Sequence, residues 1–227
     1  MNEEPAVTSA LRAAILQGAY APRQRLIEAD LCAEFGAGRF AIRGALRTLT
    51  AEGLIEIERH KGARIREIPL AEAIEITEVR AVLEGLVAAR AAERLARADL
   101  VELRAIIAAM RTAVRAGELL RYSDLNARLH TAILAMASHP TAAGILGRLR
   151  AQMVRHQFQL ALLPGRPAVS LAQHEKIVAA IRARDPEAAE QAMREHVRSV
   201  LSALRSIQAP WPASSPTGTD QLRGRAP

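Results

Sequence analysis

Residues 38–54, GRFAIRGALRTLTAEGL, read as a helix with two different sides. Arg39, Arg43 and Arg47 recur every four residues, which places them on one side of a helix. Apolar residues such as Ile42 form a second stripe that can pack against neighbouring helices. The arginine side either binds a ligand or is simply solvated, and the flanking segments decide between these alternatives.

Two shorter helices precede this stretch, and an alternating pattern follows it. Residues 8–17 and 27–35 have helical apolar spacing, and each segment is followed by a glycine. Residues 54–59 and 64–68 flank a short HKG turn, and in the first of them isoleucine alternates with glutamate, which is typical of a β-hairpin. Three helices with a tight turn between the last two, followed by a hairpin, predict a winged helix-turn-helix over residues 1–69.

The remainder of the chain has a helical pattern almost throughout. Residues 70–208 are expected to form an all-helical bundle, so the predicted fold class is mainly α. Residues 209–227 are rich in proline and serine and are expected to be disordered. Within the bundle we expect helices at 119–138, 141–162 and 186–208, and another that begins at a capping box of Ser170 and Gln173.

Composition excludes several classes of protein. Half of the 227 residues are hydrophobic, but the sequence contains no apolar run long enough to span a membrane and no secretory signal. Cys32 is the only cysteine, so an intrachain disulfide is impossible. These features predict a cytoplasmic protein that does not bind membranes. The net charge is +7, but residues 1–69 carry ten basic and nine acidic side chains, a net charge of +1. A nucleic-acid site must therefore be argued from the position of the charges.

The position of the arginine stripe favours DNA binding. In a winged helix the third helix enters the major groove, where an arginine fork can pair with guanine or neutralise phosphate. Lys61 lies at the tip of the predicted hairpin, and Gly62 permits the turn and a close approach to DNA. No matching row of glutamates is evident beside the stripe, which disfavours the merely solvated alternative. The candidate DNA-binding residues are Arg39, Arg43, Arg47, Lys61 and Gly62.

The segment from Leu11 to Ile68 resembles the DNA-binding domain of the GntR family of bacterial transcription regulators. The stretches AAILQGAYAPRQRL and DLCAEFGAGRFAIRGALRTLTAEGLIE carry the resemblance, together with the glycine of the wing. The resemblance implies that Arg39 and Arg43 contact operator DNA. The sequence departs from the family pattern at Gly38, Ala41 and Gly44, where the family usually has Ser or Thr, Pro, and Glu. We expect Gly38 to remove a helix cap or a phosphate contact.

Three histidines in the second segment are candidate metal ligands. His130, His174 and His196 stand on three different predicted helices, and Asn126 lies one turn before His130. From spacing alone, ordinary surface or core histidines are the commoner explanation. Residues 70–208 also resemble the all-helical FCD ligand-binding domain of the FadR-like branch of GntR regulators. That resemblance implies a divalent metal, with zinc, nickel or manganese as candidates, held by Asn126, His130, His174 and His196.

Arg80 is the candidate contact for a small effector. It resembles the arginine that points into the effector pocket of related proteins, and a cation beside a metal suits a carboxylate ligand. The alternative is an ordinary surface ion pair between Arg80 and Glu84, one helical turn apart. The residues leave both alternatives open.

The resulting prediction is a DNA-binding transcription regulator and not an enzyme. The resemblance implies a homodimer that binds a double-stranded operator and acts as a repressor controlled by a small carboxylate. The first alternative is a metalloenzyme with a helical bundle and an accessory DNA-binding domain. However, the metal-binding motifs Glu-x-x-His and His-Glu-x-x-His are both absent. The second alternative is an architectural DNA-binding protein with a purely structural metal.

Overall fold

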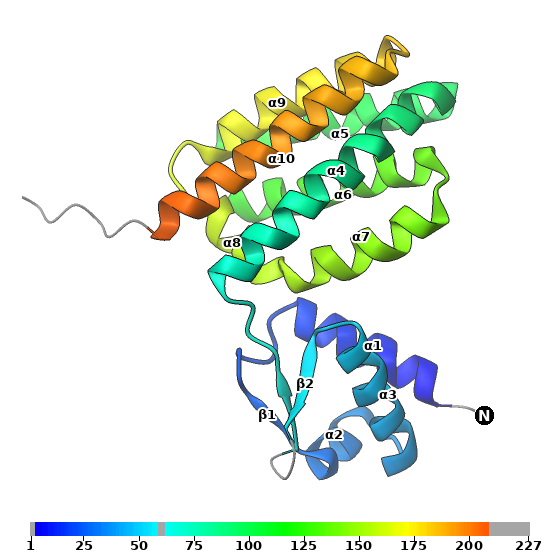
Figure 1. Ribbon diagram of the computed structural model, residues 1–227, viewed down its shortest axis with the longest axis vertical. Helices are drawn as coiled ribbons and strands as arrows, with labels where there is room; N and C mark the ends of the chain where they lie inside the picture. The colour runs from blue at the N-terminus through cyan, green and yellow to red at the C-terminus, as the bar shows by residue number, and fades with distance from the viewer. Residues whose placement is uncertain (1–2, 59–61, 209–227) are drawn as a thin grey trace, which may run out of the picture.

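The computed structural model describes residues 3–58 and 62–208 (Figure 1). The N-terminal part contains three helices and a three-stranded antiparallel sheet in the order β1-β3-β2. The predicted hairpin forms, and within it Ile55 pairs with Ile65. The bounds are α1 (Glu4–Leu16), β1 (Arg25–Leu26), α2 (Glu28–Phe35), α3 (Arg39–Ala51), β2 (Ile55–Glu58) and β3 (Gly62–Ile65).

The predicted winged helix-turn-helix is confirmed, with one addition. The short strand β1 was not predicted, because its two residues are too few to show any periodicity. It pairs with β3, with Arg25 opposite Arg64. Strand β3 therefore has a partner on both of its edges, β1 on one and β2 on the other. Residues 59–61, which include His60 and Lys61 of the expected HKG turn, lie outside the described residues, whereas Gly62 of that turn is the first residue of β3.

Helix α3 packs through the apolar side that its sequence predicted. Ile42 and Leu49 are fully buried in a core that includes Leu11 of α1 and Leu31 of α2. Arg39, Arg43 and Arg47 are exposed on the other side of the helix. Apolar burial therefore fixes the rotation of α3 about its own axis and leaves the arginine stripe facing solvent.

The two unusual glycines of α3 have different surroundings. Gly38 is the N-cap residue and provides no side-chain cap, and its N–H lies 3.4 Å from Glu3 Oε2. Gly44 is buried, and a Cβ atom there would lie 2.2–2.6 Å from the carboxylate atoms of Glu4. The absence of a side chain at Gly44 therefore leaves room for Glu4 of α1.

Seven helices form the second part of the chain as far as the structure describes it, up to residue 208. Helices α4 and α10 lie side by side along the bundle (Figure 1), α9 packs against both of them, and α5 packs against α6 and α9. The core is formed by residues such as Leu103, Met110, Ile133 and Ile177, all fully buried. The bounds are α4 (Leu70–Arg94), α5 (Arg97–Ala116), α6 (Leu119–Ala137), α7 (Pro140–Gln152), α8 (Val154–Ala161), α9 (Arg166–Arg182) and α10 (Pro186–Gln208).

Two expectations for these helices were wrong. The segment 141–162 is not one helix, because the chain breaks at Met153, whose side chain is fully buried. Ser170 and Gln173 do not open a helix, because α9 already begins at Arg166 after Gly165, which has a φ of 75°. Ser170 is instead a buried residue in the first turns of α9. None of the helices in the described part of the chain is long and apolar enough to cross a membrane.

The winged unit contacts the end of the bundle formed by α7 and α8 (Figure 1). Gln152 Nε2, at the end of α7, donates a hydrogen bond of 2.9 Å to the backbone oxygen of Glu52, the C-cap residue of α3. Glu52 in turn accepts two hydrogen bonds from Arg12 of α1, at 2.6 and 2.8 Å. His156 Nε2 of α8 lies 2.9 Å from the backbone oxygen of Ile68. The C-terminus of the arginine-bearing helix is thus anchored directly to α7.

Candidate functional site

Three histidines meet in the core of the helical bundle. His130 comes from α6, His174 from α9 and His196 from α10, and all three are buried. The Nε2 atom of His174 lies 3.3 Å from Nε2 of His130 and 3.2 Å from Nε2 of His196. Tetrahedral coordination at metal–nitrogen distances of about 2.0–2.1 Å separates ligand atoms by roughly 3.3 Å. Both separations fit a divalent metal, and the candidate ligand atoms of all three histidines lie within 4.8 Å of one another.

The other ring nitrogen of each histidine has a polar neighbour. His130 Nδ1 lies 2.9 Å from Glu84 Oε2, and His196 Nδ1 lies 3.1 Å from Gln173 Oε1. His174 Nδ1 lies 3.5 Å from the hydroxyl of Tyr122. Carboxylate and amide oxygens only accept hydrogen bonds, so His130 and His196 carry their proton on Nδ1. Their Nε2 atoms are then unprotonated and keep the lone pair that a metal ligand requires.

The electrostatics of the cluster also suit a metal. Burial lowers the pKa of His130, His174 and His196, so the three imidazoles are neutral near pH 7. Metal ligation requires this neutral form. Burial alone would raise the pKa of Glu84, but Arg80, Arg150 and His130 together hold it well below its ordinary value. A buried, ionised carboxylate therefore stands directly behind one of the candidate ligands.

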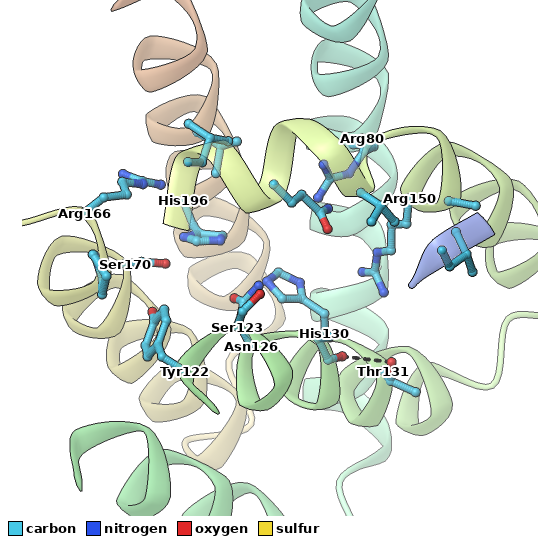
Figure 2. Close-up of a pocket in the computed structure, with 18 of the residues that line it drawn as sticks. Arg80, Tyr122, Ser123, Asn126, His130, Thr131, Arg150, Arg166, Ser170 and His196 are labelled. Atoms are coloured by element: carbon cyan, nitrogen blue, oxygen red, sulfur yellow. Dashed lines mark hydrogen bonds between the residues drawn. The ribbon is translucent and has the colours of Figure 1, made fainter. Parts of the chain in front are cut away.

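A cavity of about 320 Å³ opens beside the histidines (Figure 2). Asn126 lines it one turn before His130 on α6, and Arg80 of α4 lines it as well. Both of these predicted residues therefore lie at the same site as the histidine cluster. Leu16, the last residue of α1, also lines the cavity, so the winged unit forms part of its wall.

Arg80 has features of both alternatives that the sequence left open, an ion pair with Glu84 and a contact for the effector. Its Nε donates a hydrogen bond of 2.9 Å to Glu84 Oε1, so the pair one turn apart does form. Both side chains are buried, however, so this is not a surface pair. The Nη1 atom of Arg80 is buried and has no hydrogen-bond partner among the described residues. One end of the guanidinium is therefore fixed by Glu84 while the other is available to a ligand.

Several residues of the cavity were not predicted from the sequence. Arg150 of α7 lies 3.1 Å from Glu84 Oε2, and Arg166 of α9 donates a hydrogen bond of 2.6 Å to Ser199 Oγ. In so arginine-rich a chain, no pattern distinguishes these two arginines from the others. Burial raises the pKa of Tyr122 to about 12, so its hydroxyl remains protonated beside the cavity. Tyr122 could have been found from its spacing, because it stands four residues before Asn126 and Asn126 stands four residues before His130. This spacing places the three residues on one face of a helix.

The arginine stripe of α3 is exposed but is not free of acidic neighbours. Arg43 Nε lies 3.0 and 2.9 Å from the two carboxylate oxygens of Glu28 on α2. The sequence showed no row of glutamates beside the stripe, but a single glutamate from another helix, Glu28, does pair with Arg43. Phe40 is 77% exposed, and it lies on the same face as Arg43 and Arg47 because the spacings are three and seven residues. Gly62 has a φ of 85°, a conformation that favours glycine at the start of β3.

Comparison with known proteins assigns the chain to a family. Residues 5–65 match the model of the gntR family of bacterial regulatory proteins, and residues 75–199 match the FCD domain. The chain is 26% identical over 198 residues to the HTH-type transcriptional repressor RspR of Escherichia coli, covering 87% of each chain. It is 29% identical to a probable D-xylose utilization operon transcriptional repressor of Paenarthrobacter nicotinovorans, covering 78% of this chain and 77% of that protein.

A solved structure shares the fold. The structure described as E. coli McbR/YncC superimposes with a TM-score of 0.76 at 21% identity, covering 91% of this chain and 99% of that one. The matched family and the named relatives are transcription regulators and not enzymes, so the metalloenzyme alternative is set aside. The chain belongs to the GntR family of bacterial regulatory proteins and carries an FCD domain.

Proposed function

We propose that this protein is a cytoplasmic transcriptional repressor that binds an inverted-repeat operator as a homodimer. The observation that carries the proposal is the exposed stripe of Arg39, Arg43 and Arg47 on α3, within the segment that matches the gntR family. Relatives such as the transcriptional repressor RspR support the repressor assignment. In this proposal residues 1–69, including Lys61 and Gly62 of the wing, bind DNA, and residues 70–208 bind the effector and form the dimer.

Selection from a library of random-sequence duplexes tests this proposal. The purified protein should enrich an inverted repeat with half-sites about one helical turn, or a multiple of it, apart. The specific duplex should bind about 10³-fold or more tightly than a shuffled duplex at physiological salt. Recovery of random sequences would contradict specific recognition by α3.

We further propose that Asn126, His130, His174 and His196 hold a divalent metal. The convergent nitrogens and their neutral state support this, as does the ionised Glu84 behind His130. Imidazole nitrogen suits zinc and nickel, whereas a carbonyl oxygen such as that of Asn126 suits manganese, so this mixed ligand set does not select one of the three candidates. When bound, the metal supplies positive charge that attracts an acidic ligand. A small carboxylate in the adjacent cavity, contacted by Arg80, is the proposed effector.

The route from the cavity to DNA runs through α7. Arg150 lines the cavity and contacts Glu84, and two residues later Gln152 holds the C-cap residue of α3. An acid that pairs with Arg150 therefore contacts the end of α7, and this is the segment that is hydrogen-bonded to the recognition helix α3. The effector shifts the protein between two poses only if it binds one of them better than the other. An architectural protein would lack such coupling, so effector-dependent release from DNA separates the two alternatives.

Changing Gln152 to alanine should uncouple the two sites. The variant should still bind the acid that gives the largest thermal shift in a screen of small carboxylic acids. The ratio of operator affinities without and with that acid should fall at least fivefold, because couplings of this kind are typically about 1–3 kcal/mol. Calorimetry measures acid binding and fluorescence anisotropy measures release. Arg148→Ala, at an exposed position on the same helix, is the matched control. An unchanged ratio in Gln152→Ala would exclude this route.

Phe40 should contribute to base recognition. An exposed aromatic ring on the face that bears Arg43 and Arg47 can contact the methyl group of thymine. Replacing thymines of the selected operator one at a time by deoxyuridine removes only that methyl. At one position the affinity should fall by roughly 0.8 kcal/mol, about fourfold. Phe40→Ala should lose this sensitivity and Phe40→Leu should keep part of it. Equal binding of all thymine and uracil duplexes by the unmodified protein would rule out the contact.

A further inference from the structure

Two guanidinium groups present unpaired nitrogens at the cavity beside the histidines. Arg80 Nη1 and Arg166 Nη2 are both buried and have no hydrogen-bond partner among the described residues. Each group is held at another nitrogen, Arg80 by Glu84 at 2.9 Å and Arg166 by Ser199 at 2.6 Å. A buried N–H group without an acceptor is unfavourable. Both arginines line the cavity, so a bound ligand can supply the missing acceptors.

The two unpaired nitrogens belong to arginines on opposite sides of the histidine cluster. Figure 2 shows Arg166 on one side of His196 and His130, and Arg80 with Arg150 on the other side. Arg166 begins α9, whereas Arg80 stands in the middle of α4, so different helices fix the two positions. The hydroxyl groups of Tyr122 and Ser170 lie on the same side of the cavity as Arg166 (Figure 2). The cavity therefore has an arginine with an unpaired nitrogen on each of its two sides.

The charged side chains at the cavity do not balance one another within the described part of the protein. Arg80, Arg150 and Arg166 contribute three positive charges, and Glu84 contributes one negative charge, which leaves a net charge of +2. Glu84 contacts Arg80 and Arg150 but not Arg166, according to the ion pairs of the described residues. A single carboxylate would leave one positive charge uncompensated in a buried site, which is costly. A divalent metal would increase the excess further.

We propose that the effector of this protein is a small dianion, a short dicarboxylate whose two acid groups bind on opposite sides of the histidine cluster. One carboxylate pairs with Arg166 and the hydroxyl of Tyr122, and the other pairs with Arg80 and Arg150. A cavity of about 320 Å³ lies at the lower end of the range for ligand pockets, which suits a short acid. This inference rests on the proposed function, because it specifies the chemical class of the carboxylate effector.

Matched acids test the inference on the full-length, zinc-loaded protein. Succinate and butyrate have the same chain length and differ in one carboxylate, as do glutarate and pentanoate. Calorimetry should give at least tenfold tighter binding of one of the diacids than of its monoacid partner. Equal or tighter binding of both monoacids would overturn the dianion assignment and leave a carboxylate effector in place. Failure of all four acids to bind would overturn the assignment and count against the proposed effector site itself.

A variant of Arg166 separates the two ends of the ligand. Arg166→Gln should reduce the affinity for the preferred diacid to about that of its monoacid partner, and it should change monoacid binding less than about twofold. Arg166→Lys, which keeps the charge but not the planar fork, should restore part of the preference. Circular dichroism of each variant checks that α9 remains folded. A diacid preference that survives in Arg166→Gln would show that Arg166 does not hold the second carboxylate.

Discussion

Replacing His174 by alanine should abolish stoichiometric metal binding. His174 provides the central nitrogen of the cluster, 3.2–3.3 Å from the Nε2 atoms of the other two histidines. Losing an outer partner of a metal ligand typically costs 10–100-fold in metal affinity, so loss of a ligand itself should cost more than about 100-fold. Elemental analysis after dialysis against a metal buffer measures the effect. The unmodified protein should retain about one metal per chain and the variant close to none.

The design of this experiment must separate metal loss from misfolding. His174 is fully buried, and its truncation leaves a cavity in the core. His174→Gln keeps more of the volume and should also lose the metal. His139→Asn is the matched control, because His139 lies outside the cluster and caps α7 through its Nδ1, a role that asparagine can take over. A folded His174→Gln protein with full metal content would contradict the proposed site.

Replacing Arg43 by alanine should weaken operator binding by about 1–3 kcal/mol, which is roughly five- to 150-fold. Arg43 stands in the first half of α3, whose N-terminal residues approach base edges in this type of domain. The loss should be larger for the selected operator than for a shuffled duplex, because base contacts carry the specificity. Anisotropy titrations at several salt concentrations measure both affinities.

The pairing of Arg43 with Glu28 gives this prediction a sharper form. In the unbound protein the two side chains lie 2.9–3.0 Å apart, so DNA must compete with an exposed ion pair. Exposed ion pairs contribute only roughly 0–1 kcal/mol to stability, so DNA can readily replace Glu28 as the partner of Arg43. Arg47→Ala should instead reduce binding to all sequences and lower the salt slope by about one. Arg104→Ala, exposed on α5 of the other unit, should leave both affinities unchanged. Unchanged operator affinity in Arg43→Ala would count against the recognition-helix assignment.

Local patterns in the sequence predicted the winged unit well. The two stripes of α3 are set by four-residue spacing, and the exposed arginines and buried Ile42 follow directly from it. The features of this unit that were not predicted depend on contacts between elements. The Glu28–Arg43 pair joins two helices, and β1 exists only because β3 provides a partner for it. Neither feature leaves a periodic signal in a single segment.

The site in the bundle was less accessible to sequence reasoning. His130, His174 and His196 are separated by 44 and 22 residues, and only the packing of α6, α9 and α10 brings them together. Resemblance to the FCD domain selected them, whereas spacing alone did not. Arg150 and Arg166 were missed because an arginine-rich chain gives no reason to prefer them. The interruption between α7 and α8 at Met153 has no glycine or proline beside it, so local helix propensity does not explain it. We attribute the interruption to the burial of the Met153 side chain.

The most direct test of a ligand-controlled regulator is the affinity for the selected operator, measured with and without succinate or glutarate. We expect the zinc-loaded protein to bind the duplex about five- to 150-fold more weakly when one of these acids saturates the cavity. Addition of a chelator should remove most of this response, since the metal contributes to acid binding. An operator affinity that does not respond to any acid bound by the protein would contradict control of DNA binding by a ligand. The helical unit would then serve dimerisation alone.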